Sequence, residues 1–286
     1  MLQHPNCKIN LGLNIMHRRE DGYHNLETLF LPVGICDRLE IEPSNIFSFS
    51  QEGIPIAGDD ESNLVIRAYR ALQRLFGDAV GPCQIKLEKC IPFGAGLGGG
   101  SSDAAFTIKM LANLFNLPIS TKEMEQLAAT LGADCPFFIQ NQPAFATGIG
   151  DILSPLGFNP LEGYTLLLVK PEETVSTAEA YRGITPRDQR RDCQNTVSLA
   201  QAVKEPITKW RELIVNDFEE SVFRSHPLLS EIKNHLYTCG ALYSAMSGSG
   251  STIYGIFPSP ADMDPISNTL STTFPNTLII KLRIDN

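Results

Sequence analysis

The fold is decided by one stretch of the chain, Ile91-Pro92-Phe93-Gly94-Ala95-Gly96-Leu97-Gly98-Gly99-Gly100-Ser101-Ser102-Asp103. Residues 83–88 before it alternate between apolar and polar side chains and predict a strand, and apolar residues recur at helical spacing over residues 104–115. Five glycines within seven residues cost much chain entropy, which favours a backbone that wraps closely around something. Because a helix begins directly behind the loop, its free N–H groups and positive dipole end predict an anion site, with phosphate as the ligand.

Several known phosphate motifs do not fit this loop. A Walker A loop requires a lysine that is missing here, and a protein-kinase glycine loop lies between two strands with V-A-I-K and H-R-D signatures further on. The spacing Gly94-x-Gly96-x-x-Gly99 does match the dinucleotide pattern. However, several predicted strands precede it, and no strand-end acidic residue follows about 20 positions later. A dinucleotide oxidoreductase is therefore disfavoured by the order of the elements.

Strands and helices are predicted to be mixed in both halves of the chain. Further strands are predicted over residues 7–15, 26–33, 38–42, 164–169, 241–246, 252–257 and 278–284. Further helices are predicted over residues 63–76, 120–131 and 227–237, the second with a capping box at Ser120 and Glu123. A stretch rich in proline and glycine at residues 154–160 predicts a boundary between a domain at 1–155 and a domain at 156–286.

The strand at residues 7–15 carries an unusual second face. One side is apolar, whereas the other side carries Lys8, Asn10, Gly12 and Asn14. These residues are small and polar, as expected of a face on which something lies. The alternative is an ordinary edge strand with an exposed Lys8.

Composition excludes several classes of protein. The 286 residues carry a formal net charge of −9, and without basic clusters such a chain is a poor binder of nucleic acid or of anionic membranes. No run of about 18 apolar residues and no signal-peptide pattern is present, so we expect a cytoplasmic protein. The seven cysteines include no C-x-x-C pair, which argues against a disulfide scaffold or structural zinc and favours buried free thiols. We expect a monomer or a homodimer.

Three segments of the chain resemble the three motifs of the GHMP small-molecule kinase superfamily. Pro92 to Ala104 is similar to the second motif, P-x-[GA]-x-G-L-G-[GS]-G-S-S-x-A. The first motif is similar to Pro5-Asn6-Cys7-Lys8-Ile9-Asn10-Leu11, and the third to Ser247-Gly248-Ser249-Gly250-Ser251. The resemblance implies a two-domain α+β fold with an N-terminal mixed α/β domain and a C-terminal ferredoxin-like domain. It also places the active site in the cleft between these domains.

Two further segments resemble one branch of this superfamily. They are Arg19-Glu20-Asp21-Gly22-Tyr23-His24 with the residues around it, and Leu131-Gly132-Ala133-Asp134-Cys135-Pro136-Phe137-Phe138. The resemblance implies ATP-dependent phosphorylation of the 2-hydroxyl in a cytidine diphosphate-linked polyol, within the non-mevalonate route to isoprenoids. Mevalonate, homoserine and galactose kinases are alternatives that the Gly-Tyr-His segment disfavours. A catalytically inactive binding protein is another, and it would be expected to lack Lys8 or Asp134.

The resemblance also implies roles for individual residues. Asp134 would accept the proton of the hydroxyl, and Lys8 would pair with it and either activate the hydroxyl or stabilise the transition state. Asn10 would hydrogen-bond the substrate. The loop from Pro92 to Ser102 would hold the triphosphate of ATP, and Ser101 or Ser102 would help to hold Mg²⁺.

The nucleoside contacts follow from the same resemblance. Tyr23, His24, Thr177 and Tyr181 would bind the cytidine end of the substrate, where aromatic rings provide stacking. Asn63 and Lys89 would contact the adenine of ATP. Two residues depart from the superfamily pattern, since Ala95 replaces a common glycine and Asp103 stands where asparagine is frequent. An extra carboxylate close to phosphate is unfavourable unless a helix end or a cation offsets it.

Overall fold

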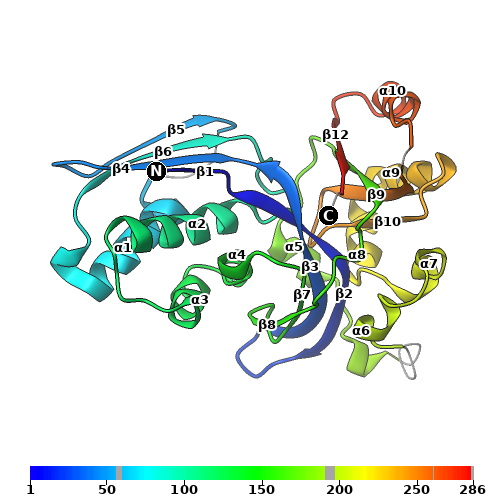
Figure 1. The fold of residues 1–286 in the computed structure, drawn as a ribbon. Coiled ribbons are helices and arrows are strands. Elements are labelled where there is room, and N and C mark those ends of the chain that lie inside the picture. The colour runs from blue at the N-terminus through cyan, green and yellow to red at the C-terminus, as the bar shows by residue number, and fades with distance from the viewer. Residues whose placement is uncertain (56–59, 191–196, 260, 285–286) are drawn as a thin grey trace. The chain divides into compact units, whose positions relative to one another are not determined.

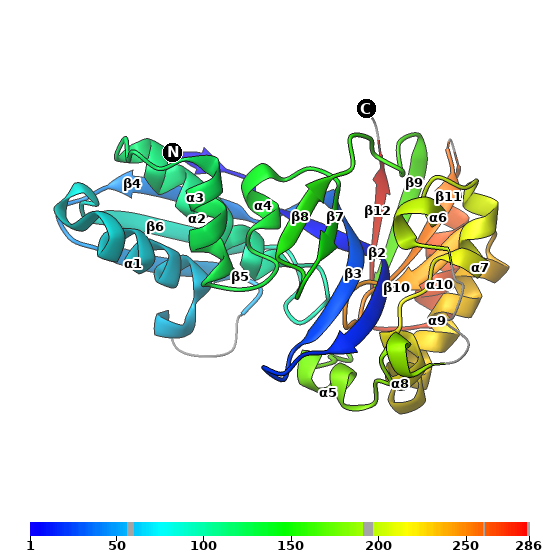
Figure 2. The same cartoon turned by 90° about the horizontal axis from the view of Figure 1, so that it is seen from below.

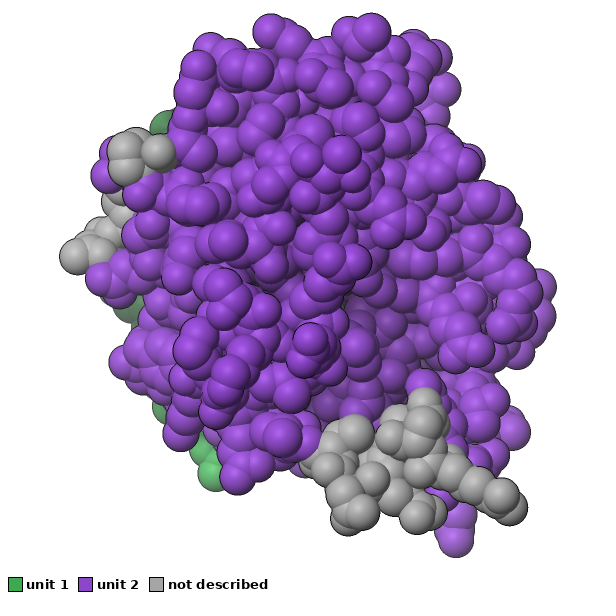
Figure 3. Space-filling model, turned by 90° about the vertical axis from the view of Figure 1, so that its right-hand side faces the viewer, with its two compact units in different colours: residues 1–8, 32–93, 98–142 green, residues 9–31, 94–97, 143–286 purple. Residues whose placement is uncertain are grey.

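The computed structural model describes residues 1–55, 60–190, 197–259 and 261–284. Figures 1 and 2 show the arrangement of its helices and strands. The chain forms two compact units, each built from separate stretches: unit 1 comprises residues 1–8, 32–93 and 98–142, and unit 2 comprises residues 9–31, 94–97 and 143–286. Figure 3 colours both units on the molecular surface. Because the units follow contacts rather than chain order, the contiguous division at residue 155 stays a prediction.

Unit 1 contains a four-stranded sheet in the order β1-β4-β6-β5. Its strands are β1 (Leu2–Gln3), β4 (Arg38–Pro43), β6 (Cys83–Lys89) and β5 (Ser48–Gly53). Strands β5 and β6 are parallel and are connected through α1 (Leu64–Phe76), whereas the other pairs are antiparallel. Helices α1 and α2 (Gly99–Leu114) pack together and cover one face of this sheet (Figure 1).

The caps of these helices explain where they begin and end. The Asn63 side chain accepts a hydrogen bond from the Val65 N–H at the start of α1, and Gly77 ends that helix with a positive φ of 56°. The predicted capping box of Ser120 and Glu123 is present at the start of α3 (Thr121–Ala129). The short helix α4 (Phe137–Gln140) follows Pro136, so Asp134 lies in the turn between α3 and α4.

A second sheet has the order β2-β3-β7-β8. Its strands are β2 (Asn6–Arg18), β3 (His24–Cys36), β7 (Ala144–Thr147) and β8 (Ile152–Pro155). Both faces of β2 are buried over residues 7–15, and Lys8 and Asn10 are each 3% exposed. The polar face of this strand is therefore covered. Although β2 stands at the end of the strand order, the alternative of an exposed Lys8 is wrong.

The third sheet lies in unit 2 and is antiparallel throughout, in the order β10-β11-β9-β12. Its strands are β9 (Tyr164–Lys170), β10 (Tyr243–Met246), β11 (Ile253–Pro258) and β12 (Leu278–Arg283). Helices precede β10, and α10 (Asp264–Thr273) connects β11 to β12, which gives the β-α-β-β-α-β order of a ferredoxin-like fold. Helix α9 (Pro227–Thr238) packs on β10 and β11 (Figure 2).

Four shorter helices complete unit 2: α5 (Thr177–Arg182), α6 (Leu199–Ala202), α7 (Trp210–Leu213) and α8 (Phe218–Ser225). Neither these helices nor β5, β7, β8 and α10 were predicted from the sequence. Several are only four residues long, so they are too short to show a clear apolar period. The elements that were predicted lie within a few residues of their expected bounds, whereas α8 and α10 were missed although they have 8 and 10 residues.

The cysteines and apolar segments agree only partly with expectation. Cys7, Cys83 and Cys135 are buried, whereas Cys90 is exposed and Cys36 and Cys239 are half-buried, so the prediction of mostly buried thiols was too broad. Among the described residues these six thiols are free, and Cys193 lies outside those residues. Across the same residues, none of the helices has the length and apolar character needed to cross a bilayer.

Candidate active site

The centre of the candidate site is an ion pair within unit 1. Lys8 on β2 places its Nζ 3.2 Å from Oδ2 of Asp134, and the two side chains are 4% and 35% exposed, respectively. The lysine is thus shielded, whereas the carboxylate is accessible from solvent. The pairing of these two residues was expected from the family resemblance, and the contact confirms it.

The glycine loop meets this pair at Gly98. A Cβ atom at Gly98 would lie 3.0 Å from Cε of Lys8 and 3.1 Å from the Phe138 ring, and its φ of +70° also favours glycine. Gly98 is the N-cap of α2, whose first N–H groups have no carbonyl partners within the helix. The loop therefore brings the start of a helix directly against the Lys8 side chain, and both elements belong to unit 1.

The two serines of the loop differ in their surroundings. Ser102 is fully buried, and its Oγ has no hydrogen-bond partner among the described residues. Ser101 is half-buried and hydrogen-bonds Cys135, although burial still raises the pKa of that thiol to about 12. Ser102 thus has a buried hydroxyl without a hydrogen-bond partner among the described residues, close to the start of α2.

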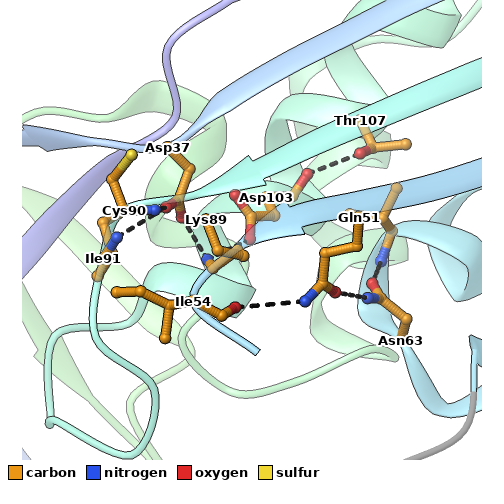
Figure 4. A network of polar contacts seen from close by, with 10 residues as sticks. Asp37, Gln51, Ile54, Asn63, Lys89, Cys90, Ile91, Asp103 and Thr107 are labelled. Carbon is orange, nitrogen blue, oxygen red and sulfur yellow. Dashed lines mark hydrogen bonds and ion pairs between the residues drawn. The ribbon is translucent and has the colours of Figure 1, made fainter. Parts of the chain in front are cut away.

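The residues predicted to contact adenine are both engaged by protein groups (Figure 4). Besides capping α1, Asn63 donates from Nδ2 to Oε1 of Gln51 at 3.3 Å. Lys89 is 3% exposed and is paired with Asp37 and, at 2.7 Å, with Asp103. A direct contact between Lys89 and adenine therefore stays a prediction.

Within unit 2, the third motif forms a tight turn against the other part of the glycine loop. The Ser247 hydroxyl donates to the carbonyl oxygen of Gly96 at 2.9 Å and accepts from the backbone N–H of Asn10 at 3.2 Å. A Cβ atom at Gly96 would lie 2.1 Å from the Ser247 carbonyl oxygen, so only glycine fits there. The first, second and third motifs therefore meet at the Ser247 hydroxyl, although they lie far apart in the sequence.

Asn216 supports this turn and was not predicted from the sequence. Its Nδ2 donates to the carbonyl oxygens of Met246 and Gly248, both at 2.8 Å, and the side chain is buried. The neighbouring Asp217 accepts from the Ile15 N–H and from Arg187, which fixes β2 to the same segment. A single asparagine in a loop gives no local signal of such a role.

The aromatic residues predicted for cytidine lie together in unit 2, with one exception. The His24 and Tyr181 rings are stacked, with centroids 5.0 Å apart and an interplanar angle of 19°, and Phe218 meets Tyr181 edge-on at 4.8 Å. Thr177 lies 3.4 Å from the Ser249 hydroxyl. Tyr23 is 62% exposed, and no ring contact is found for it among the described residues. Burial, aided by Arg18, lowers the pKa of His24 and favours the neutral ring.

A histidine outside the predicted set holds the segment that carries Tyr181. His226, at the start of α9, contacts Glu173 through Nδ1 and Glu179 through Nε2, each at 3.0 Å. Glu179 belongs to α5, together with Tyr181 and Thr177. Although burial opposes it, the two carboxylates raise the pKa of His226 and favour the doubly protonated ring. Isolated in the sequence, this histidine shows no pattern that predicts such contacts.

Comparison with known proteins agrees with this geometry. The family of GHMP kinases N terminal domains matches residues 63–148, and the family of GHMP kinases C terminal domains matches residues 198–276. The fold and the glycine loop thus define a small-molecule kinase of the GHMP class. Known kinases with the name 4-diphosphocytidyl-2-C-methyl-D-erythritol kinase from Bacteroides thetaiotaomicron and Parabacteroides distasonis are 50% and 49% identical to the chain. These alignments cover 90% and 91% of this chain and 92% and 93% of the relatives. The chain belongs to the 4-diphosphocytidyl-2-C-methyl-D-erythritol kinase family.

Solved structures support the same assignment. A crystal structure of 4-(cytidine 5'-diphospho)-2C-methyl-D-erythritol kinase is 32% identical, with a TM-score of 0.78 and 99% of each chain covered. The mevalonate kinase of Methanococcus jannaschii has a TM-score of 0.72 at 13% identity, with 100% of this chain and 98% of that chain covered. At this identity it shares the fold alone.

Proposed function

We propose that the chain transfers the γ-phosphoryl group of Mg-ATP to the 2-hydroxyl of 4-diphosphocytidyl-2-C-methyl-D-erythritol, in the non-mevalonate route to isoprenoids. The observation that carries the proposal is the ion pair of Lys8 and Asp134, packed against Gly98 at the start of α2. An alcohol nucleophile, a carboxylate base and a phosphate-binding helix start are the groups that this transfer requires. The name of the relatives supplies the identity of the acceptor.

In the proposed reaction, the substrate oxygen forms a bond to the γ-phosphorus and loses its proton to Asp134. The bond between the γ-phosphorus and the bridging oxygen breaks, and ADP leaves with that oxygen. Asp134 suits this role because it is accessible, while the shielded Lys8 holds its carboxylate in place. The ammonium group of Lys8 also offsets negative charge that develops on the transferring phosphoryl group.

The phosphates of ATP would bind at the glycine loop, Pro92 to Ser102, through backbone N–H groups at the start of α2. Mg²⁺ would enter with the triphosphate, whose oxygens would supply some of its ligands, with water supplying others. The hydroxyl of Ser102 is the protein group best suited to complete them, because it is buried without a partner among the described residues. Among the same residues, no three acidic, histidine or cysteine side chains cluster closely enough to form a metal site of their own.

The cytidine end of the substrate would bind in unit 2. His24 and Tyr181 already present stacked aromatic faces, and Thr177 lies on the same helix as Tyr181. Asn10 lies two residues beyond Lys8 on β2, and its backbone is held by Ser247 and Tyr254. We propose that Asn10 hydrogen-bonds the polyol, that Tyr23 covers the cytosine, and that Asn63 contacts the adenine.

A substrate panel tests the proposal. ADP formation should be rapid with 4-diphosphocytidyl-2-C-methyl-D-erythritol and absent with mevalonate or homoserine, and NAD reduction should not occur with any of them. Phosphate should appear at the 2-position of the product, as read by ³¹P–¹H correlation. Turnover of mevalonate in place of the cytidyl substrate would contradict the proposal.

A further inference from the structure

The most deeply buried charged cluster among the described residues lies in unit 1, beside the glycine loop (Figure 4). Lys89 at the end of β6 is paired with Asp37, between β3 and β4, and with Asp103, on α2. The three residues are only 3%, 1% and 1% exposed, respectively. Two carboxylates therefore share one ammonium group almost out of contact with solvent.

The cluster joins the two ends of the glycine loop within unit 1. At the start of the loop, Oδ1 of Asp37 accepts hydrogen bonds from the backbone N–H groups of Cys90 at 2.6 Å and Ile91 at 2.8 Å. At its end, Asp103 stands one turn into α2, and Lys89 bridges from Asp37 to Oδ2 of Asp103. The two ends of the loop are thus cross-linked through three side chains.

Gly99 shows how closely these ends approach. A Cβ atom at Gly99 would lie 2.8 Å from Cγ2 of Ile91 and 3.4 Å from Nζ of Lys89. No side chain fits between the first residue of α2 and the strand end that precedes the loop. The position of the helix start, and thus of its N–H groups, depends on how Lys89 and Ile91 are held.

A contribution to the stability of the fold does not by itself explain why this charged cluster is buried. Burying an ammonium group with two carboxylates carries a desolvation cost that apolar residues of the same volume avoid. Oδ1 of Asp103 has no hydrogen-bond partner among the described residues, and burial raises the pKa of this carboxyl to about 7. The ammonium group of Lys89 offsets the negative charge of Asp103. The extra carboxylate near the phosphate loop is therefore paired with a cation.

We propose that Asp37, Lys89 and Asp103 are positioning residues that hold the two ends of the glycine loop at a fixed separation, so that the N–H groups at the start of α2 are preorganised for phosphate. This inference rests on the proposed function, since it assumes that the loop binds the phosphates of ATP. It assigns to Lys89 a role through the loop rather than through the adenine ring.

The test compares a ligand with phosphates to one without them. Lys89→Met leaves two buried carboxylates without a counter-charge and should destabilise the protein. The neutral double variant Lys89→Met/Asp103→Asn should recover much of that stability, yet its loop ends remain uncoupled. We expect its Kd for Mg-ADP to rise about tenfold, while the inhibition constant of adenosine changes by less than about twofold.

Two further variants complete the design. Asp103→Asn alone keeps an oxygen acceptor for Lys89 and should leave the Kd for Mg-ADP within about threefold of wild type. Lys86→Met makes the same chemical change at an exposed position of the same strand. It should change neither the binding of Mg-ADP or adenosine nor the thermal stability. Thermal unfolding of each variant is measured in parallel, so that loss of fold is separated from loss of phosphate binding.

The outcomes separate the hypotheses. If the binding of Mg-ADP and the binding of adenosine weaken by the same factor in the double variant, Lys89 acts on the nucleoside and the proposal is wrong. If the double variant recovers its stability and its Kd for Mg-ADP equals that of wild type, the cluster serves folding only, and the proposal is also wrong. If the wild-type protein binds neither Mg-ADP nor Mg-ATP, the proposed function itself fails.

Discussion

Lys8 and Asp134 lie 126 positions apart in the sequence, yet their charged atoms are 3.2 Å apart in unit 1. The two side chains differ in exposure to solvent. The lysine is shielded by Gly98 and its neighbours, while about a third of the Asp134 side chain remains exposed. An accessible base held by a buried cation is suited to accept a proton from a bound alcohol.

Replacing Asp134 with Asn should reduce kcat by about 10²–10⁴-fold, because the amide cannot accept the hydroxyl proton. The fold should survive, since Asp134 is partly exposed and lies in a turn. Steady-state kinetics, with Mg-ADP binding and thermal unfolding as controls, checks both parts. Undiminished turnover in Asp134→Asn would rule out its role as the base.

Gly96→Ala should destabilise the protein by more than about 2 kcal/mol, because the left-handed backbone alone costs about 1–2 kcal/mol and the new Cβ would overlap the Ser247 carbonyl oxygen. Gly240→Ala is a matched control, since Gly240 also has a positive φ of 93° but nothing lies within 4 Å of its Cβ position. Urea unfolding of both variants gives the comparison. Equal losses would show that the contact with Ser247 contributes nothing.

The contact of His226 with Glu173 and Glu179 should make stability depend on pH. Its pKa is raised in the folded protein, so its stabilisation is complete below the unfolded value of about 6.5 and is lost as pH rises through the higher folded value. Wild type should therefore exceed His226→Gln in unfolding free energy at pH 6, and the difference should shrink by pH 8.5. A difference that grows with pH would contradict this assignment.

Activity should depend more on Mg²⁺ than on ionic strength. The chain carries a net charge of −9 and both proposed substrates are polyanions, so long-range attraction does not assist binding. Local groups and phosphate-bound Mg²⁺ must supply the attraction. Chelation with EDTA should abolish turnover, whereas KM for ATP should change only a few-fold between about 50 and 300 mM salt. Turnover without divalent cations would refute this account.

Local patterns predicted much of the secondary structure and several site residues. The strand at residues 7–15, the glycine loop and the capping box at Ser120 each carry their signal within a few neighbouring residues. The pairing of Lys8 with Asp134 was predicted through the family resemblance and is confirmed by the 3.2 Å contact. Short elements such as β7 and α6 were missed because four residues are too few to establish a period.

Supporting residues could not be predicted in the same way. Asn216 holds the carbonyl oxygens of Met246 and Gly248 across about 30 positions, and His226 reaches Glu173 across 53. Nothing near either residue in the sequence distinguishes it from an ordinary loop polar residue. The pairing of Lys89 with Asp37 and Asp103 was not predicted either.

The amino-acid sequence by itself determined the order of strand, glycine loop and helix, because backbone freedom, capping and apolar period are properties of neighbouring residues. Only the tertiary structure decided which charges meet. The ammonium group of Lys89, at the end of β6, is paired with the carboxylates of Asp37 and Asp103 from two other segments, and it offsets the charge of Asp103. The reason is physical: electrostatic and hydrogen-bond energies depend on separation in space and on burial, and neither is encoded in any one stretch of chain.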